Sequence, residues 1–375
     1  MTSPTDSDED PFDAPPRAPE SAHGDARDAS HPHDRAEGRD HPYSRLTPDC
    51  VLDALEEIGY FGDGRLLALN SYENRVYRVN LEEGGPDNAK SVVAKFYRPE
   101  RWSDAAILEE HGFVAELAAA EIPVVPPLAD AQGRTLHHHN HFRFAVFPTR
   151  GGRSPEIDDP EVLEWIGRFI GRIHAVGVRA PYRERISFTP ENFGHAPRAW
   201  LLEHGFVPAD LRPAWEAATA QALEGVQAAW QRAGNVRILR LHGDCHPGNI
   251  LWTEGLQGQI GGPHFVDFDD SCMGPAIQDL WMLLSGTRAD MTRQLADVLA
   301  GYEDFMEFDP RELHLVEALR TLRLLHYSAW LARRWHDPAF PAAFPWFNTQ
   351  RYWEERVLEM REQIALMSEP PLWPA

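Results

Sequence analysis

The sequence predicts an α+β protein in which a small strand-rich lobe precedes a larger helix-rich lobe. Its 375 residues exceed what a single hydrophobic core usually fills. Short segments rich in β-branched and aromatic residues occur before residue 150, whereas longer segments with helical periodicity dominate afterwards. Strands grouped ahead of helices favour separate lobes over a doubly wound sheet. We therefore expect a ligand site in a cleft between the two lobes.

The composition excludes several classes of protein. Hydrophobic residues make up 43% of the chain and charged residues 25%, which is typical of a folded globular protein. The formal net charge is −22, and so acidic a surface repels nucleic acid and anionic lipid. We therefore expect neither a nucleic-acid partner nor a membrane partner.

Three segments are expected along the chain: an acidic tail over residues 1–42, a first lobe over 43–148 and a second lobe over 149–375. The tail holds eleven acidic residues against four arginines and is rich in proline, so we expect it to be disordered. The three cysteines lack CxxC spacing, and Met1 is not followed by a basic and apolar leader. These features predict a cytoplasmic protein without disulfides.

The first lobe is expected to begin with a helix at Pro48, capped by Thr47 and ended by Gly59. An antiparallel meander is predicted from three short strands, and two further strands follow a second helix. That helix is expected to start at Ser103 or Asp104 and to end near Ala120. The predicted strands cover residues 66–69, 75–80, 91–96, 134–138 and 142–147.

The second lobe is expected to be mainly helical. Asp159 and Pro160 form a start signal ahead of an apolar periodic segment. Further helices are predicted over residues 211–232, 276–285, 291–306 and 310–334.

The most informative motif is the run His242-Gly243-Asp244-Cys245-His246-Pro247-Gly248-Asn249, which is followed eighteen residues after Asn249 by Asp267. A loop of this kind can hold Asp244 where it accepts a proton from a hydroxyl group. The amide of Asn249 and the carboxylate of Asp267 supply the oxygen ligands that a hard cation prefers. Mg²⁺ retains water and phosphate ligands, so two protein ligands suffice, and the pattern predicts phosphoryl transfer from a nucleoside triphosphate.

A lysine that contacts the phosphates is expected on the third strand. Lys95 follows three apolar residues, so it is predicted to lie on a core strand with its ammonium directed to the ligand. Such a lysine needs a carboxylate to orient it. We expect Glu110 on the next helix to do so, with Glu109 as the alternative.

The motif HGDxHxGN followed by DxD resembles the kinase-like phosphotransferase superfamily, which includes aminoglycoside phosphotransferases, choline kinases and protein kinases. Residues 69–77, 95–102 and 274–284 are similar to bacterial stress response kinases, which are serine/threonine protein kinases. The similarity extends over about residues 43–367. It implies a protein-kinase-like two-lobed fold, with an antiparallel-sheet lobe that binds nucleotide and a helical catalytic lobe.

The resemblance also implies roles for individual residues. The interlobe hinge would lie at residues 145–149, and Asp279 would brace the catalytic loop. The remaining roles are Asp244 as proton acceptor, Asn249 and Asp267 as Mg²⁺ ligands at the catalytic centre, Lys95 as the phosphate anchor, and Ser71 as a contact to ATP.

The chain departs from the usual protein-kinase pattern in three places. It has no GxGxxG, His-Gly-Asp replaces His-Arg-Asp, and Asp-Phe-Asp replaces Asp-Phe-Gly. Control through a phosphorylated activation loop is therefore not expected.

The resulting prediction is an ATP- and Mg²⁺-dependent serine/threonine protein kinase that acts in a stress response and can phosphorylate itself. Two alternatives stay open. One is a kinase of small hydroxyl compounds such as aminoglycosides, choline or amino alcohols, because the acidic Asp269 and Asp270 suit a cationic acceptor. The other is a nucleotide-binding scaffold without activity, in which the acidic tail would bind a partner.

Overall fold

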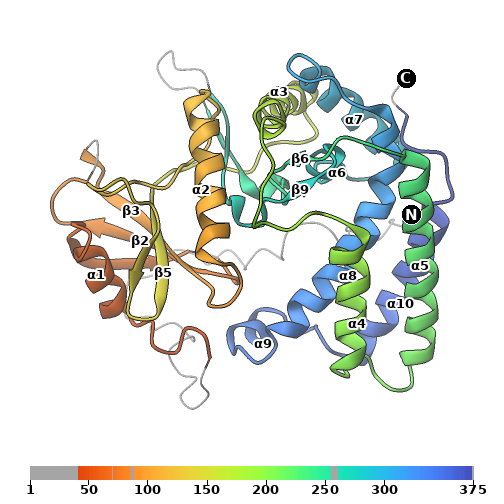
Figure 1. Cartoon of the computed structure of the whole chain (residues 1–375), viewed down its shortest axis with the longest axis horizontal. Helices are drawn as coiled ribbons and strands as arrows, with labels where there is room; N and C mark the ends of the chain where they lie inside the picture. Colours follow the sequence, from red (N-terminus) through yellow and green to blue (C-terminus); the bar gives the residue numbers. More distant parts are fainter. Residues whose placement is uncertain (1–40, 70, 86–87, 255–260, 374–375) are drawn as a thin grey trace, which may run out of the picture.

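The structure is a computed structural model that describes residues 41–69, 71–85, 88–254 and 261–373 (Figure 1). The tail predicted over residues 1–42 lies outside the described residues except for its last two positions. The expected α+β architecture is confirmed, with a sheet-containing lobe followed by a helical lobe.

A five-stranded antiparallel sheet, in the order β1-β2-β3-β5-β4, forms the first lobe. The sheet has two different faces because side chains alternate along each strand. On β3, Val92, Ala94 and Phe96 are buried against α1. Lys95 and Tyr97 therefore face the opposite side, toward α2. The strands are β1 (Gly62–Ala68), β2 (Arg75–Leu81), β3 (Ser91–Tyr97), β4 (His137–His139) and β5 (Phe142–Pro148).

The two helices of this lobe, α1 (Pro48–Glu56) and α2 (Asp104–Ala119), start at the caps that the sequence predicts. The hydroxyl of Thr47 accepts a hydrogen bond of 3.2 Å from the Cys50 N–H. The Ser103 hydroxyl accepts one of 3.1 Å from the Ala106 N–H. Both hydroxyls satisfy backbone donors that a helix start leaves without an intrahelical partner.

Helices form most of the second lobe, and α3 and α7 lie side by side at one end of it (Figure 1). The helix predicted over residues 310–334 is divided into a 3₁₀ turn (Pro310–Leu315) and α8. The helix predicted over 276–285 is limited to α6, and three helices, α4, α9 and α10, were not anticipated. The helices are α3 (Pro160–Gly177), α4 (Ala196–Glu203), α5 (Arg212–Ala233), α6 (Ile277–Trp281), α7 (Arg288–Tyr302), α8 (Val316–Arg333), α9 (Ala339–Ala343) and α10 (Gln350–Leu366).

Two short antiparallel strand pairs in the second lobe flank the motif residues. β6 (Leu239–Arg240) pairs with β9 (Met273–Gly274), and β7 (Ile250–Thr253) pairs with β8 (Gly262–Phe265). The loop between β6 and β7 contains the HGDxHxGN motif, and the segment after β8 contains Asp267. Among the described helices, none combines the length and apolar character needed to cross a bilayer.

Candidate functional site

The loop that carries Asp244 is held by the carboxylate of Asp279 on α6. This carboxylate accepts hydrogen bonds of 2.8 Å from the backbone N–H groups of both His242 and Gly243. It also lies 3.0 Å from Nε2 of the buried His174 on α3. Gly243 adopts φ +87°, and a Cβ atom there would lie 2.1 Å from the Asp270 carbonyl oxygen. Glycine is therefore required at this position, and Asp279 braces the loop as the resemblance implied.

Asp244 is contacted by a cation that the sequence did not reveal. Its Oδ1 accepts a hydrogen bond of 2.6 Å from Nη1 of Arg323 on α8, and its Oδ2 lies 3.6 Å from Nε2 of His246. Burial acts to raise the pKa of the Asp244 carboxyl, but Arg323 and the neighbouring imidazoles outweigh burial and lower it below the ordinary value. Asp244 is thus ionised at neutral pH and suited to accept or orient a hydroxyl proton.

Asn249 and Asp267 are brought together by adjacent backbone. The Val266 N–H donates a hydrogen bond of 3.0 Å to the carbonyl oxygen of Asn249. The side-chain amide of Asn249 donates one of 2.9 Å to the Asp244 carbonyl, which leaves its amide oxygen as the atom available to a ligand. Asp267 has a left-handed backbone, φ 61° and ψ 61°, and its side chain is 53% exposed. Its backbone thus adopts a conformation that few residues other than glycine, asparagine and aspartate take, and its accessible carboxylate can bind a ligand.

The donor set fits a magnesium ion that keeps phosphate and water ligands. An amide oxygen and a carboxylate are both hard donors. Within the described residues, no group of three or more His, Cys, Asp or Glu side chains could by itself hold a metal ion. With Asn249 and Asp267 as donors, the site fits a cation whose other ligands are phosphate and water oxygens.

Lys95 lies beside the same segment. Its Nζ is 2.9 Å from Oδ1 of Asp267 and 3.2 Å from Oδ1 of Asp269. Burial acts to lower the pKa of this ammonium, but the two carboxylates, together with Glu110, raise it well above the ordinary value. Lys95 is therefore a permanent cation next to the expected metal ligand.

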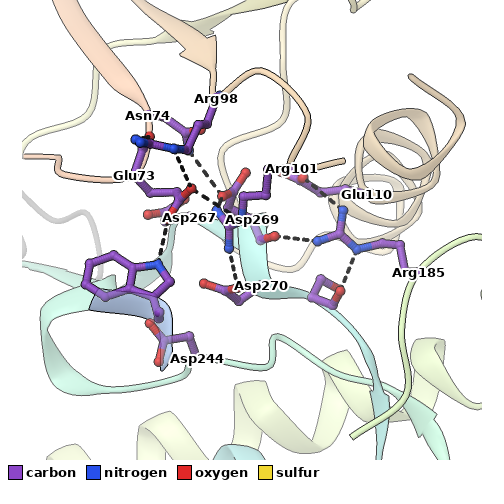
Figure 2. A network of polar contacts seen from close by, with 12 residues as sticks. Glu73, Asn74, Arg98, Arg101, Glu110, Arg185, Asp244, Asp267, Asp269 and Asp270 are labelled. Carbon is purple, nitrogen blue, oxygen red and sulfur yellow. Dashed lines mark hydrogen bonds and ion pairs between the residues drawn. The ribbon is translucent and has the colours of Figure 1, made fainter. Parts of the chain in front are cut away.

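Asp269 is the buried centre of a network that links the two lobes (Figure 2). It is 3% exposed, and its Oδ2 accepts hydrogen bonds from Arg101 and, at 3.1 Å, from the side-chain amide of Asn74. Asp270 is also bound by Arg101, at 2.5 Å. Both acidic residues that the sequence offered for a cationic acceptor are thus paired with one arginine.

The two glutamates considered for Lys95 have other partners. Within the described residues, no ion pair joins Lys95 to Glu110, and Glu110 instead lies 3.5 Å from Nη1 of Arg185. Glu109 accepts hydrogen bonds from the backbone N–H groups of residues 183–185. Burial raises the pKa of Glu110 to about 7, although Lys95 and Arg185 act to lower it.

The remaining expected positions are Ser71 and the hinge residues 145–149. Ser71 is half-buried in the turn between β1 and β2, close in sequence to Asn74, which contacts Asp269. Of the expected hinge, residues 145–148 belong to β5, where Ala145 is the register partner of Lys95.

The comparisons with known proteins agree with this geometry. Residues 65–316 match the model of a family described as "Phosphotransferase enzyme family". The chain belongs to this phosphotransferase family. The fold and the resemblance expected from the HGDxHxGN and DxD motifs are therefore both confirmed, and the protein is a phosphotransferase.

Two curated relatives from enteric bacteria cover most of the chain. Stress response kinase A of Escherichia coli strain K12 is 44% identical over 330 residues, which is 88% of this chain and 96% of the relative. The serine/threonine protein kinase RdoA of Salmonella typhimurium is 43% identical over the same share of each chain.

Solved structures of two kinases share the fold. An amicoumacin kinase in complex with AMP-PNP and Ca²⁺ is 18% identical, with a TM-score of 0.65, and covers 87% of this chain and 95% of its own. A microcompartment-associated aminopropanol kinase is 19% identical, with a TM-score of 0.64, over 86% of this chain and 96% of its own. At these identities the likeness concerns the fold.

Proposed function

We propose that this phosphotransferase is an ATP- and Mg²⁺-dependent serine/threonine protein kinase with a role in a stress response. The observation that carries the proposal is the pairing of Asp269 and Asp270 with Arg101. These are the acids that would suit a cationic small acceptor, and both are already engaged by the guanidinium, which offsets part of their charge. The name of the Salmonella relative, a serine/threonine protein kinase, favours a protein acceptor, and that of the Escherichia coli relative favours a stress response.

The charge beside the proton acceptor supports the same choice. Arg323 contacts Asp244, so an acceptor hydroxyl would approach a carboxylate that is already partly neutralised. An aminoglycoside or amino alcohol carries positive charge near its hydroxyl and would be repelled by this guanidinium. A serine or threonine side chain in a peptide carries no such charge.

In the proposed reaction, Asp244 orients the acceptor hydroxyl and takes its proton as the oxygen attacks the γ-phosphorus of ATP. The bond from the γ-phosphorus to the bridging oxygen breaks, and ADP leaves with that oxygen. Lys95 holds the phosphates, and Asn249 and Asp267 hold Mg²⁺, which when bound offsets the negative charge of the phosphates. Ser71 contacts the nucleotide from the turn between β1 and β2. A serine or threonine of the chain itself can also accept the phosphoryl group in the same step.

The proposal is tested with γ-labelled ATP, Mg²⁺ and the variant Asp244→Asn. We expect label on a generic protein acceptor, or on the chain itself, to form at least about 10²-fold more slowly in the variant, because a positioned proton acceptor contributes that much or more. Binding of a fluorescent ATP analogue should be retained. The exposed Asp158 provides the control, since Asp158→Asn should leave turnover unchanged.

Parallel assays separate the proposal from its alternatives. A pool of aminoglycosides, choline and amino alcohols replaces the protein acceptor in a second assay. Label that appears only on a small compound would replace the protein-kinase proposal by a small-molecule kinase. Nucleotide binding without transfer to any acceptor would indicate the inactive scaffold.

A further inference from the structure

The carboxylates that contact Lys95 differ from the ones predicted from the sequence. In the expected arrangement, a glutamate of α2 orients the lysine that binds the phosphates. In this chain the helix supplies Glu110, but its carboxylate lies beside Arg185 (Figure 2). Lys95 instead pairs with Asp267 and Asp269. The role of any partner of Lys95 in binding nucleotide rests on the proposed function.

Glu110 is held in place by the surroundings of Arg185. The Arg185 guanidinium is buried and donates hydrogen bonds to three carbonyl oxygens, those of Ala106 on α2 and of Asp269 and Ser271 after β8. Moving Arg185 would leave these carbonyls without donors, which is costly in a buried site. Removing Glu110 from Arg185 would leave the guanidinium without its carboxylate. Glu110 therefore has its ion-pair partner in Arg185, while Lys95 acts on it as a nearby charge without an ion pair among the described residues.

Asp267 and Asp269 are not equivalent partners for the lysine. Asp267 is half-exposed and is the carboxylate expected to bind Mg²⁺, so a bound cation competes with Lys95 for it. Asp269 is buried and has its Oδ2 fixed by Asn74 and Arg101. Its Oδ1 is buried without a hydrogen-bond partner among the described residues, and this atom faces Lys95 at 3.2 Å. An oxygen in this position is available to the ammonium alone.

We propose that Asp269 is the residue that positions Lys95 for the triphosphate, in place of Glu110. Asp269 lies two residues after Asp267, so one short segment sets the position of both the cation ligand and the phosphate-binding lysine. The same carboxylate is tied to Asn74 beside β2 and to Arg101 before α2. Lys95 is thus placed without any movement of α2, and a shift of that helix is not required to complete the site.

The test is a double-mutant cycle read by nucleotide affinity. The full chain and the variants Asp269→Asn and Glu110→Gln are each prepared with Lys95 intact and with Lys95→Met. The dissociation constant for mant-ATP with Mg²⁺ is measured by fluorescence, and melting temperatures are recorded alongside. Both single variants replace a carboxylate by its matched amide, so they change charge without changing side-chain size.

We expect Asp269→Asn to raise the dissociation constant about tenfold, which corresponds to a loss of about 1.4 kcal/mol. Its amide would direct N–H groups toward the lysine ammonium, whereas Glu110→Gln should change the constant less than twofold. In the Lys95→Met background, Asp269→Asn should have no further effect, because its influence passes through the lysine. A residue that acts only on folding would keep its effect in that background.

Two outcomes would overturn the inference alone. One is that the wild-type chain binds mant-ATP and the Asp269→Asn variant binds it with the same dissociation constant. The other is a tenfold loss in Glu110→Gln that disappears in the Lys95→Met background, which can be measured even when Asp269→Asn does not fold. Failure of the wild-type chain to bind mant-ATP would instead overturn the proposed function, and the assignment of Asp269 with it.

Discussion

At the scale of single residues, Asp279 holds the loop that carries Asp244. It is fully buried, and its two oxygens satisfy the N–H groups of His242 and Gly243 as well as the ring of His174. A carboxylate is suited to this position because it only accepts hydrogen bonds. Any neutral replacement leaves at least one buried donor without an acceptor.

We expect Asp279→Asn to lower the free energy of unfolding by about 3 kcal/mol, since its amide group would face backbone N–H donors in a buried site. Turnover should fall because Asp244 loses the fixed loop that holds it. Urea unfolding and steady-state kinetics measure the two effects. Asp158→Asn serves as the exposed control, and equal stability of the two variants would contradict the bracing role.

At the scale of elements, the contact between α3 and α7 depends on three glycines that let the helices approach closely. A Cβ atom on Gly167 would lie 2.0 Å from the Val298 carbonyl oxygen, and one on Gly301 would lie 1.9 Å from that of Glu164. Gly171 meets Tyr302 in the same way. Because α3 also carries His174, this packing fixes the support of Asp279.

The element-scale prediction compares two glycine-to-alanine changes in helices. Gly167→Ala forces backbone of α3 and α7 apart, and we expect it to destabilise the protein by about 2–3 kcal/mol. Gly112 lies on the exposed face of α2, with nothing within 4 Å of an added Cβ. Gly112→Ala should be neutral or stabilising by up to about 1 kcal/mol through helix propensity. Thermal and urea unfolding of both variants distinguish these expectations, and similar values would be evidence against the close helix contact.

At the scale of the whole molecule, contacts at the end of α8 join the lobes in addition to the Asp269 network and the connection that follows β5. Glu73, in the turn before β2, pairs with Arg334 beyond the end of α8 and accepts a hydrogen bond from the Trp330 indole. Arg98 at the end of β3 binds the fully buried Asp337 at 3.1 Å. These contacts span segments more than 200 residues apart, so they fix one lobe against the other.

The stability of the whole chain should also respond to pH through His111. This residue of α2 is buried between the Tyr97 hydroxyl, at 2.7 Å, and the Thr135 hydroxyl, at 2.8 Å. Burial lowers its pKa to about 3, with Lys95 and Arg185 acting in the same direction. In the unfolded chain, its pKa returns to about 6.5. The unfolded state therefore binds more protons between these values, and the contribution of neutral His111 to stability is lost as the pH falls from 6.5 toward 3.

We expect the variant His111→Gln to be less stable than the wild type at pH 7 to 8. Its deficit should shrink by roughly 1 kcal/mol for each unit that the pH falls between 6 and 4, because only the wild type loses this contribution. Urea unfolding at a series of pH values measures the deficit. The exposed His141 supplies the control, and His141→Gln should give a curve parallel to that of the wild type. A deficit of His111→Gln that does not change with pH would contradict the assignment.

Helix caps, strand alternation and motif spacing are the features of this protein that could be predicted from its sequence. Thr47 and Ser103 cap their helices with their own hydroxyls, and alternation along β3 places Lys95 on the face opposite Phe96. The spacing of Asp244, Asn249 and Asp267 indicated phosphotransferase chemistry because these residues lie on neighbouring loops of one chain segment. Caps, alternation and motif spacing all act over a few residues, so they can be read without the fold.

Only the tertiary structure decided which charges meet. Arg323 lies 79 residues from Asp244 in the sequence, and Arg185 lies 75 residues from Glu110. The residues around each arginine do not indicate which carboxylate it will contact. The choice between Glu110 and Asp269 for Lys95 likewise depends on how α2 packs on the segment after β8. Arg185 pairs with Glu110 and Arg101 pairs with Asp269, and both contacts are largely buried. These pairings arise because elements that are distant in the sequence pack together.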